Sequence, residues 1–300
     1  GFDLPGVHYL RTIDDAERLK HDLSRAGHVL VVGAGFIGSE VAASARVLGR
    51  SVTLVDLLPA PLAGVLGEEI GRVYAAIHER QGVALRMGTR VTELHGTGQV
   101  EEAILDTGER IACDLVVVGV GVRPETSLVE GTGIAIENGI LVDELCRTSV
   151  PDVFAAGDVA NWWHPRLKRR LRVEHFDNAG QQGAAAGMSM AGTGEPYAPI
   201  PYFWSDQYEV NLQWAGFPGP WERLVLRGDR DEPSLTAFYL AGGRVQAAVT
   251  TNQPREFRAA RRIVEAGTAI DPAVLGNPGT DLRALSRRLQ PDGAAPTDEH

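Results

Sequence analysis

The sequence predicts an α/β fold with a parallel sheet, followed by a smaller α+β region. Apolar strands alternate with helical patterns from residue 28 onward, and a glycine-rich turn joins the first of these strands to its helix. In the last third of the chain the pattern changes, because short strands follow one another directly and a helix comes after them. A chain of 300 residues has room for about two domains.

The glycine-rich turn predicts a dinucleotide site. An apolar strand over 28–32 leads into Gly33-Ala34-Gly35-Phe36-Ile37-Gly38, and a helical pattern continues to Leu48. In such a turn the first glycine permits the tight bend, the second lets a pyrophosphate approach the backbone, and the third lets helix and strand pack closely. The phosphates bind at the helix N-terminus, where free N–H groups and the helix dipole favour negative charge. The expected cofactor contacts are Gly33, Gly35, Phe36, Ile37 and Gly38.

An acidic residue in the expected place supports this assignment. The second strand, 51–56, ends at Asp56, which is about 20 residues beyond the last glycine, where the ribose hydroxyls of NAD are bound. Asp56 would repel the 2′-phosphate of NADP, and the next two residues are leucines, so we expect NADH. The alternative is that Asp56 only ends a strand at a turn.

The other elements of the first region follow from periodicity. Apolar residues at helical spacing predict helices over 13–26, capped by Thr12 or Asp14, and over 67–81. The continuous apolar run 115–118 predicts a central strand buried on both faces, ending at Gly119 and Gly121. Short strands bounded by turns predict a β-meander packed on the parallel sheet, over 83–87, 90–95, 100–105 and 110–111.

A second glycine motif follows the segment Val-Gly-Val-Gly-Val-Arg-Pro at 118–124. A short strand over 153–156 is expected to run into Gly157-Asp158-Val159. Glycine permits close approach there, and the aspartate accepts hydrogen bonds from the ribityl chain of a flavin near its pyrophosphate. The whole block predicts an FAD site, although the Gly-Asp pair alone would equally suit a turn. Beyond it, an antiparallel sheet with a helix is predicted over 224–226, 235–240, 244–250 and 256–265.

Composition excludes several classes of protein. The net charge of −10 argues against a general nucleic-acid binder, and no apolar run approaches the roughly 20 residues of a membrane helix. Cys113 and Cys146 are the only cysteines, so no closely spaced pair exists for the chemistry of disulfide reductases. We expect two buried thiols, a cytoplasmic protein without a signal peptide, and no metal site.

These motifs resemble the oxygenase-coupled, NADH-dependent ferredoxin reductases of the putidaredoxin reductase type, within the FAD-dependent pyridine nucleotide-disulfide oxidoreductase superfamily. The resemblance runs from about residue 4 to 289 and is most specific at 5–12, 173–179 and 201–208. It implies a Rossmann-like two-dinucleotide-binding flavoprotein fold, in which the NAD domain is inserted into the FAD domain. The implied parts are the end of an FAD segment (1–12), the NAD domain (13–120), a second FAD segment (121–195), a C-terminal reductase domain (196–290) and a disordered tail (291–300).

The resemblance also implies an activity. Such an enzyme takes a hydride from NADH onto FAD and passes single electrons to a [2Fe–2S] ferredoxin that feeds an oxygenase. It places Glu40 and Glu174 beside the nicotinamide and Trp204 beside the isoalloxazine, as candidate catalytic residues. It also places Ala179 and the start of its helix, near Asp177, at the flavin. Alternatively, the two glutamates are solvated surface acids and Trp204 belongs to the core of the C-terminal domain.

Members of this family carry an N-terminal segment with a GxGxxG turn of its own, which holds the ADP half of FAD. This sequence contains one such turn, so we expect that segment to be missing and FAD binding by the chain alone to be weakened. Two other interpretations stay open. One is another NADH-dependent flavoprotein, such as a rubredoxin reductase, a nitrite reductase component or an NADH oxidase. The other is an NADH-binding module without a flavin.

Two basic clusters predict where an acidic ferredoxin docks, because complementary charge speeds encounter and fixes orientation. The first cluster comprises Arg166, Lys168, Arg169, Arg170 and Arg172. The second comprises Arg255, Arg258, Arg261 and Arg262, at helical spacing. The alternative is an ordinary solvated basic surface.

Overall fold

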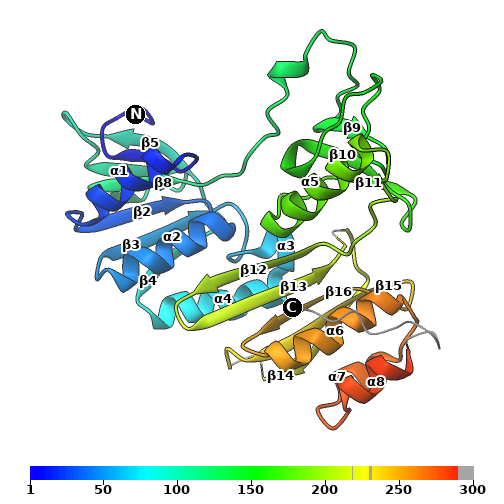
Figure 1. Ribbon diagram of the computed structural model, residues 1–300. Helices are drawn as coiled ribbons and strands as arrows, with labels where there is room; N and C mark the ends of the chain where they lie inside the picture. The colour runs from blue at the N-terminus through cyan, green and yellow to red at the C-terminus, as the bar shows by residue number, and fades with distance from the viewer. Residues whose placement is uncertain (218, 230–231, 290–300) are drawn as a thin grey trace. The chain divides into compact units, whose positions relative to one another are not determined.

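The computed structural model describes residues 1–217, 219–229 and 232–289, which fall into two compact units (Figure 1). The first unit contains Gly1–Gly121 together with the short segments Ser205–Asn211 and Asp229–Ser234. The second contains Val122–Trp204, Leu212–Gly228 and the chain from Leu235 onward. The predicted tail over 291–300 lies outside the described residues.

A five-stranded parallel sheet forms the centre of the first unit, in the order β1-β8-β2-β3-β4. The predicted strand Leu115–Val118 is β8, and its first three residues are at most 1% exposed, which confirms a central buried strand. The strands are β1 (Val7–Tyr9), β2 (His28–Val32), β3 (Ser51–Asp56), β4 (Val83–Met87) and β8 (Leu115–Val118).

Different layers cover the two faces of this sheet, because alternate residues of a strand point to opposite sides. Val29 and Val31 of β2 face helices α1 and α2, whereas Leu30 between them faces a small antiparallel sheet. The helices of this unit are α1 (Ile13–Leu23), α2 (Phe36–Val47), α3 (Ala63–Leu66) and α4 (Glu68–Arg80). The helices α1, α2 and α4 confirm the predicted ones, whereas α3 was not predicted.

The predicted meander is correct for three of its four strands. The small antiparallel sheet consists of β5 (Val91–His95), β6 (Glu102–Leu105) and β7 (Arg110–Ala112). The prediction that 83–87 belongs to this meander is wrong, because β4 pairs in parallel with β3. Helices α3 and α4 lie between β3 and β4 in the chain, and a helical crossover is the usual connection between parallel neighbours.

The second unit contains two sheets. Its larger sheet has the order β12-β13-β16-β15-β14, with antiparallel pairing from β13 to β14, and α6 packs on β16. The three strands and the helix predicted for the last third are confirmed as β14, β15, β16 and α6. The elements are β12 (Tyr202–Gln207), β13 (Val210–Gly216), β14 (Arg223–Gly228), β15 (Leu235–Ala241), β16 (Arg244–Thr251), α6 (Pro254–Ala266), α7 (Pro272–Gly276) and α8 (Leu282–Arg288).

The smaller sheet has the order β11-β10-β9, from β9 (Ile140–Val142), β10 (Ala160–His164) and β11 (Arg169–Leu171), and α5 (Phe176–Met190) follows it. Two 3-10 turns, η1 (Ser127–Val129) and η2 (Gly157–Val159), lie in the same unit. The predicted strand over 153–156 is wrong, because Phe154 makes only an isolated bridge with Arg147. After a turn at Asp152, whose φ is 63°, the segment lies beside 146–148, where Thr148 donates to Val153 and Ala155 donates to Cys146 through backbone hydrogen bonds.

Candidate functional site

Three glycines of the predicted dinucleotide turn meet different surroundings. Gly33 has a φ of 99°, and a Cβ on it would lie 2.4 Å from the carbonyl oxygen of Gly119 at the end of β8. A Cβ on Gly38 would lie 1.8 Å from the carbonyl oxygen of Gly33. A Cβ on Gly35 would meet no atom within 4 Å, and this residue is exposed. The fold therefore requires two of these glycines, whereas Gly35 leaves open space before the first turn of α2, where a pyrophosphate fits.

Asp56 lies directly beside this turn. Its Oδ2 accepts a hydrogen bond from the backbone N–H of Ala34 at 2.5 Å, and its Oδ1 accepts one from Leu58 at 2.7 Å. The parallel pairing of β2 with β3 brings these residues together across 22 positions of sequence. A carboxylate has lone pairs to spare after two hydrogen bonds, so Asp56 can also accept from ribose hydroxyls. Leu57 and Leu58 follow it as exposed apolar side chains.

Glu40 lies in α2, shortly after the glycine turn, and is not a fully solvated acid. Its Oε1 accepts a hydrogen bond of 2.6 Å from the Ser205 hydroxyl. Burial raises the pKa of Glu40, and the Ser205 hydroxyl opposes this rise. This partner could not be predicted from the sequence, because Ser205 lies 165 positions away, in β12.

The residues of the predicted FAD motif lie together in the second unit. Gly157 has a φ of 79°, its N–H donates to Gln182 Oε1 at 2.9 Å, and a Cβ on it would lie 3.5 Å from the Cβ of Ala179. Asp158 is exposed. The buried Gln182 Nε2 has no partner among the described residues. Gly157 has a backbone conformation that glycine adopts readily, Asp158 is an exposed acceptor, and Gln182 Nε2 is a donor without a partner among the described residues. These residues, which lie at η2 and in α5, fit the flavin cofactor.

Glu174 and Trp204 also lie in the second unit. Glu174 pairs with Arg172 at 2.5 Å, and the same guanidinium nitrogen donates to the carbonyl oxygen of Asp158 at 3.2 Å. Trp204 is 43% exposed, packs edge-on against Phe176 at 6.2 Å and stacks on Tyr202 at 5.8 Å. Its exposure does not support the alternative that it belongs to the core, and a flat aromatic surface of this kind suits an isoalloxazine ring.

Each unit therefore assembles its own part of the predicted site. The first unit holds Gly33, Gly35, Phe36, Ile37, Gly38, Glu40, Asp56, Gly119 and Gly121. The second unit holds Gly157, Asp158, Val159, Glu174, Ala179 and Trp204.

The two cysteines are free and buried, as expected. Burial raises the pKa of Cys113 to about 12 and that of Cys146 to about 11. Both thiols therefore stay protonated near neutral pH, and a protonated, buried thiol is a poor nucleophile.

Three arginines of the first basic cluster donate hydrogen bonds to backbone carbonyl oxygens of the same unit. Arg170 donates to the carbonyl oxygens of Val142 at 2.9 Å and Asn161 at 2.8 Å. Arg166 donates to the carbonyl oxygen of Glu265, and Arg172 is bound as described above. Several of these arginines therefore stabilise loops and strands through internal hydrogen bonds.

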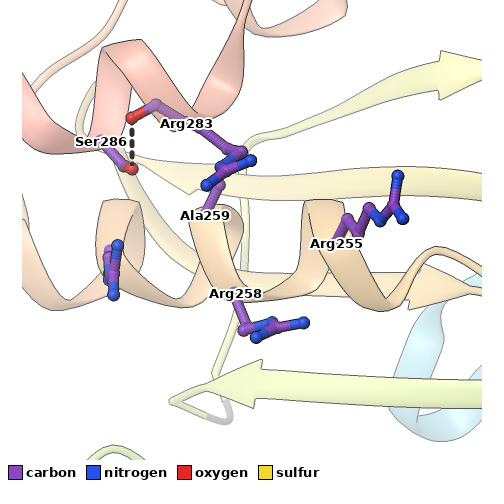
Figure 2. A pocket seen from close by; sticks show the side chains of 6 residues that line it. Arg255, Arg258, Ala259, Arg283 and Ser286 are labelled. Carbon is purple, nitrogen blue, oxygen red and sulfur yellow. Dashed lines mark hydrogen bonds between the residues drawn. The ribbon is translucent and has the colours of Figure 1, made fainter. Parts of the chain in front are cut away.

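The second basic cluster surrounds a pocket of about 190 Å³ between α6 and α8 (Figure 2). Arg261 is the exception within the predicted cluster, because it pairs with Glu265 at 3.2 Å and does not line the pocket. Arg283 of α8 also lines the pocket and was not predicted from the sequence. The arginines at 283, 287 and 288, close together in the sequence, could have indicated it. In the part of the chain that the structure describes, Arg255, Arg258 and Arg262 have no ion-pair partner. The lining residues are Arg255, Arg258, Ala259, Arg262, Arg283 and Ser286.

No helix within residues 1–217, 219–229 and 232–289 is long and apolar enough to cross a membrane.

Comparison with known proteins agrees with this geometry. The family model of the pyridine nucleotide-disulphide oxidoreductases matches residues 1–183, and that of the reductase C-terminal domain matches residues 202–286. The ferredoxin–NAD(+) reductase component of the anthranilate 1,2-dioxygenase system of Burkholderia cepacia is 40% identical over 283 residues, which are 93% of this chain and 69% of that protein.

Two solved structures are similar over almost the whole chain. The ferredoxin reductase for the CYP199A2 system from Rhodopseudomonas palustris has a TM-score of 0.91 and 35% identity, and the match covers 95% of this chain and 71% of that one. Putidaredoxin reductase in its covalent complex with putidaredoxin has a TM-score of 0.91 and 32% identity, and the match covers 95% of this chain and 69% of that one. The chain therefore belongs to the pyridine nucleotide-disulphide oxidoreductase family, among the members that carry the reductase C-terminal domain.

Proposed function

We propose that this chain is the NADH-binding and C-terminal part, with a segment of the FAD-binding part, of a flavoprotein that reduces a [2Fe–2S] ferredoxin supplying an oxygenase. The relatives described above are named as ferredoxin or putidaredoxin reductases, and one solved relative is in a covalent complex with putidaredoxin. FAD supplies the chemistry, since it accepts a hydride from NADH and releases electrons singly. We place the protein in the cytoplasm, where free thiols such as these stay reduced.

The observation that carries this proposal is the state of the two thiols. A disulfide reductase of the same family would need a pair of cysteines, one of them a thiolate near neutral pH. Here Cys113 and Cys146 belong to different units, and both are buried with a raised pKa. These 300 residues therefore offer the flavin no cysteine relay, and a one-electron acceptor protein fits this property.

The residues of the chain bind and orient the cofactors in this proposal. The open space at Gly35 and the start of α2 receive the pyrophosphate of NADH, and Asp56 accepts hydrogen bonds from its ribose. The turn at Gly157 and the start of α5 receive the flavin, with Trp204 beside the ring. We assign residues 13–120 to NADH, 121–195 to FAD and 196–290 to the C-terminal domain.

We further propose that the ferredoxin docks on the pocket of Arg255, Arg258, Arg262 and Arg283 (Figure 2). Arg255, Arg258 and Arg262 have no ion-pair partner among the described residues, and such guanidinium groups favour an acidic partner. The double variant Arg258→Glu/Arg262→Glu should lower the rate of ferredoxin reduction about tenfold at low salt and reduce its salt dependence, while reduction of a neutral dye stays unchanged.

The matched control is Arg223→Glu, which changes an exposed arginine of the same unit outside the pocket. Arg170→Glu is unsuitable, because it would break the hydrogen bonds to Val142 and Asn161. If the double variant and the control lose ferredoxin reduction equally, the pocket is not the docking surface.

The function itself is tested by purifying the chain with added FAD and recording its visible spectrum before and after NADH. The expected result is a bound flavin that NADH bleaches and that then reduces a [2Fe–2S] ferredoxin faster than it reduces oxygen. A flavin that is reoxidised by oxygen but not by ferredoxin indicates an NADH oxidase. Because FAD binding by the chain alone is expected to be weak, FAD is added in excess. A protein that binds NADH but no flavin even under these conditions indicates a module without a flavin, and either outcome rejects the proposal.

A further inference from the structure

The tip of the β12–β13 hairpin presents polar side chains to the interior of the first unit. The segment Ser205–Asn211 belongs to this unit, and along β12 the side chains alternate between inward and outward positions. Ser205 is 1% and Gln207 0% exposed, whereas Asp206 between them is exposed. Two buried polar side chains on one face of a strand require hydrogen-bonding partners.

These partners form a chain of hydrogen bonds from the hairpin to helices α2 and α4. The Ser205 hydroxyl lies 2.6 Å from Glu40 Oε1, and Gln207 Nε2 lies 3.2 Å from the same hydroxyl. Gln207 Oε1 lies 3.0 Å from His78 Nε2. His78 Nδ1 lies 3.1 Å from the Tyr208 hydroxyl.

The donor and acceptor properties of these groups allow only one direction of donation along the series of hydrogen bonds. An ionised carboxylate only accepts, so Ser205 donates its one proton to Glu40 and accepts from the Gln207 amide nitrogen. The amide oxygen of Gln207 must then accept from His78 Nε2–H. The remaining ring nitrogen, Nδ1, accepts from Tyr208. Each donor therefore polarises the next one toward Glu40.

The surroundings of His78 agree with this direction. His78 is 0% exposed, and burial lowers its pKa to about 4, so near neutral pH the ring is neutral and carries a single N–H. Tyr74, from the same helix, is also 0% exposed, and its hydroxyl has no partner among the described residues. Burial raises the pKa of Tyr74, and the carboxylates of Asp206 and Glu40 add to this rise.

We infer that Ser205, Gln207 and His78 are positioning residues, which fix Oε1 of Glu40 and leave Oε2 as the acceptor for the carboxamide of the nicotinamide. This inference rests on the proposed function, because it takes Glu40 as a residue that faces NADH. The remainder of NADH contacts Gly35 and Asp56, which do not belong to the hydrogen-bond chain. Loss of these hydrogen bonds should therefore weaken only the contact with the nicotinamide.

The test compares the binding of NAD⁺ with that of ADP-ribose, which lacks the nicotinamide, by titration calorimetry. Ser205→Ala and Gln207→Leu should each raise the Kd for NAD⁺ about fivefold and leave the Kd for ADP-ribose within about twofold. Ser205→Thr keeps the hydroxyl and should restore NAD⁺ binding. The matched control is Asn211→Ala in the same hairpin, which removes the hydrogen bond to Asp206 on the exposed side.

The outcomes separate the inference from the proposed function. Equal weakening of both ligands by Ser205→Ala and Gln207→Leu would show a purely structural role and overturn the inference. If Glu40→Gln weakens NAD⁺ selectively but Ser205→Ala and Gln207→Leu do not, the inference alone is wrong. If Glu40→Gln leaves the ratio of the two Kd values unchanged, the proposed role of Glu40 is wrong, and the inference fails with it.

Discussion

Gly35 and Gly38 lie three residues apart in one turn, but the structure assigns them different purposes. A Cβ on Gly38 would overlap the carbonyl oxygen of Gly33, whereas a Cβ on Gly35 would enter open space. We expect Gly38→Ala to lower the free energy of unfolding by at least about 1–3 kcal/mol, as overpacking does. Gly35→Ala should leave the melting temperature unchanged and weaken NAD⁺ binding, because the methyl group occupies the space of the pyrophosphate.

Thermal unfolding and NAD⁺ titration of both variants check this prediction. An unchanged Kd in Gly35→Ala would mean that the space in front of this glycine does not hold a ligand, whereas loss of stability in this variant would mean that the space is not open.

His78 makes the stability of the first unit depend on pH. Burial lowers its pKa in the folded state to about 4 from an ordinary value of 6.5. Between these values the unfolded chain binds a proton that the folded chain does not. The stabilisation is thus complete above pH 6.5 and decreases as the pH falls, by about 3 kcal/mol at pH 4.

His78→Gln removes this titrating group and should flatten the pH dependence between pH 6.5 and 4. Urea unfolding of both proteins at several pH values measures the change. His175, whose pKa burial also lowers to about 4, stays present in both proteins and keeps its own contribution. Identical slopes for the two proteins would show that His78 titrates normally.

At the scale of elements, α1 begins with a complete capping box. The Thr12 hydroxyl accepts from the N–H of Asp15 at 3.2 Å, and the Asp15 carboxylate accepts from the N–H of Thr12 at 2.8 Å. Thr12→Ala should therefore lower the free energy of unfolding by about 1 kcal/mol. Thr12→Ser keeps the capping hydroxyl and should lower the free energy of unfolding much less. Urea unfolding provides the measurement, and equal values for the two variants would show that the cap contributes nothing.

The elements that the sequence predicted are those with a local signal. Thr12 was one of the two predicted caps for α1, and the apolar alternation of β2 and β3 is visible without any partner. The smaller sheet of the second unit was missed, although Trp162 of β10 is completely buried. Its strands are short, and their pairing depends on partners up to 20 residues away.

The same distinction holds for the candidate site. The glycine turns and Asp56 can be recognised in the sequence, because their spacing along the chain matches that of a dinucleotide-binding strand, turn, helix and strand. The partners of Glu40 are not, because Ser205 reaches it through the tertiary fold. Docking on the basic run over 166–172 stays a prediction, and charge in a sequence does not reveal that Arg170 binds two backbone carbonyl groups.

At the scale of the whole molecule, the two units have separate cores and separate spectroscopic signals. The cores of the first unit lie on the two faces of its parallel sheet, and the core of the second includes Trp162. The five tryptophans, which are Trp162, Trp163, Trp204, Trp214 and Trp221, all belong to the second unit. Tryptophan fluorescence therefore reports unfolding of the second unit, and amide hydrogen exchange in β2, β3 and β8 reports the first.

This separation allows the cofactor assignment to be tested unit by unit. A ligand at 100 times its Kd stabilises the folded state that binds it by about 2.7 kcal/mol. FAD should raise the melting temperature seen by tryptophan fluorescence, because Gly157 and Trp204 lie in that unit. NAD⁺ should instead slow amide exchange in β2, β3 and β8, and Gly35→Ala should abolish that effect. A shift of the tryptophan transition by NAD⁺ that persists in Gly35→Ala would contradict the assignment, because the nucleotide would then be binding to the unit that carries the flavin motif.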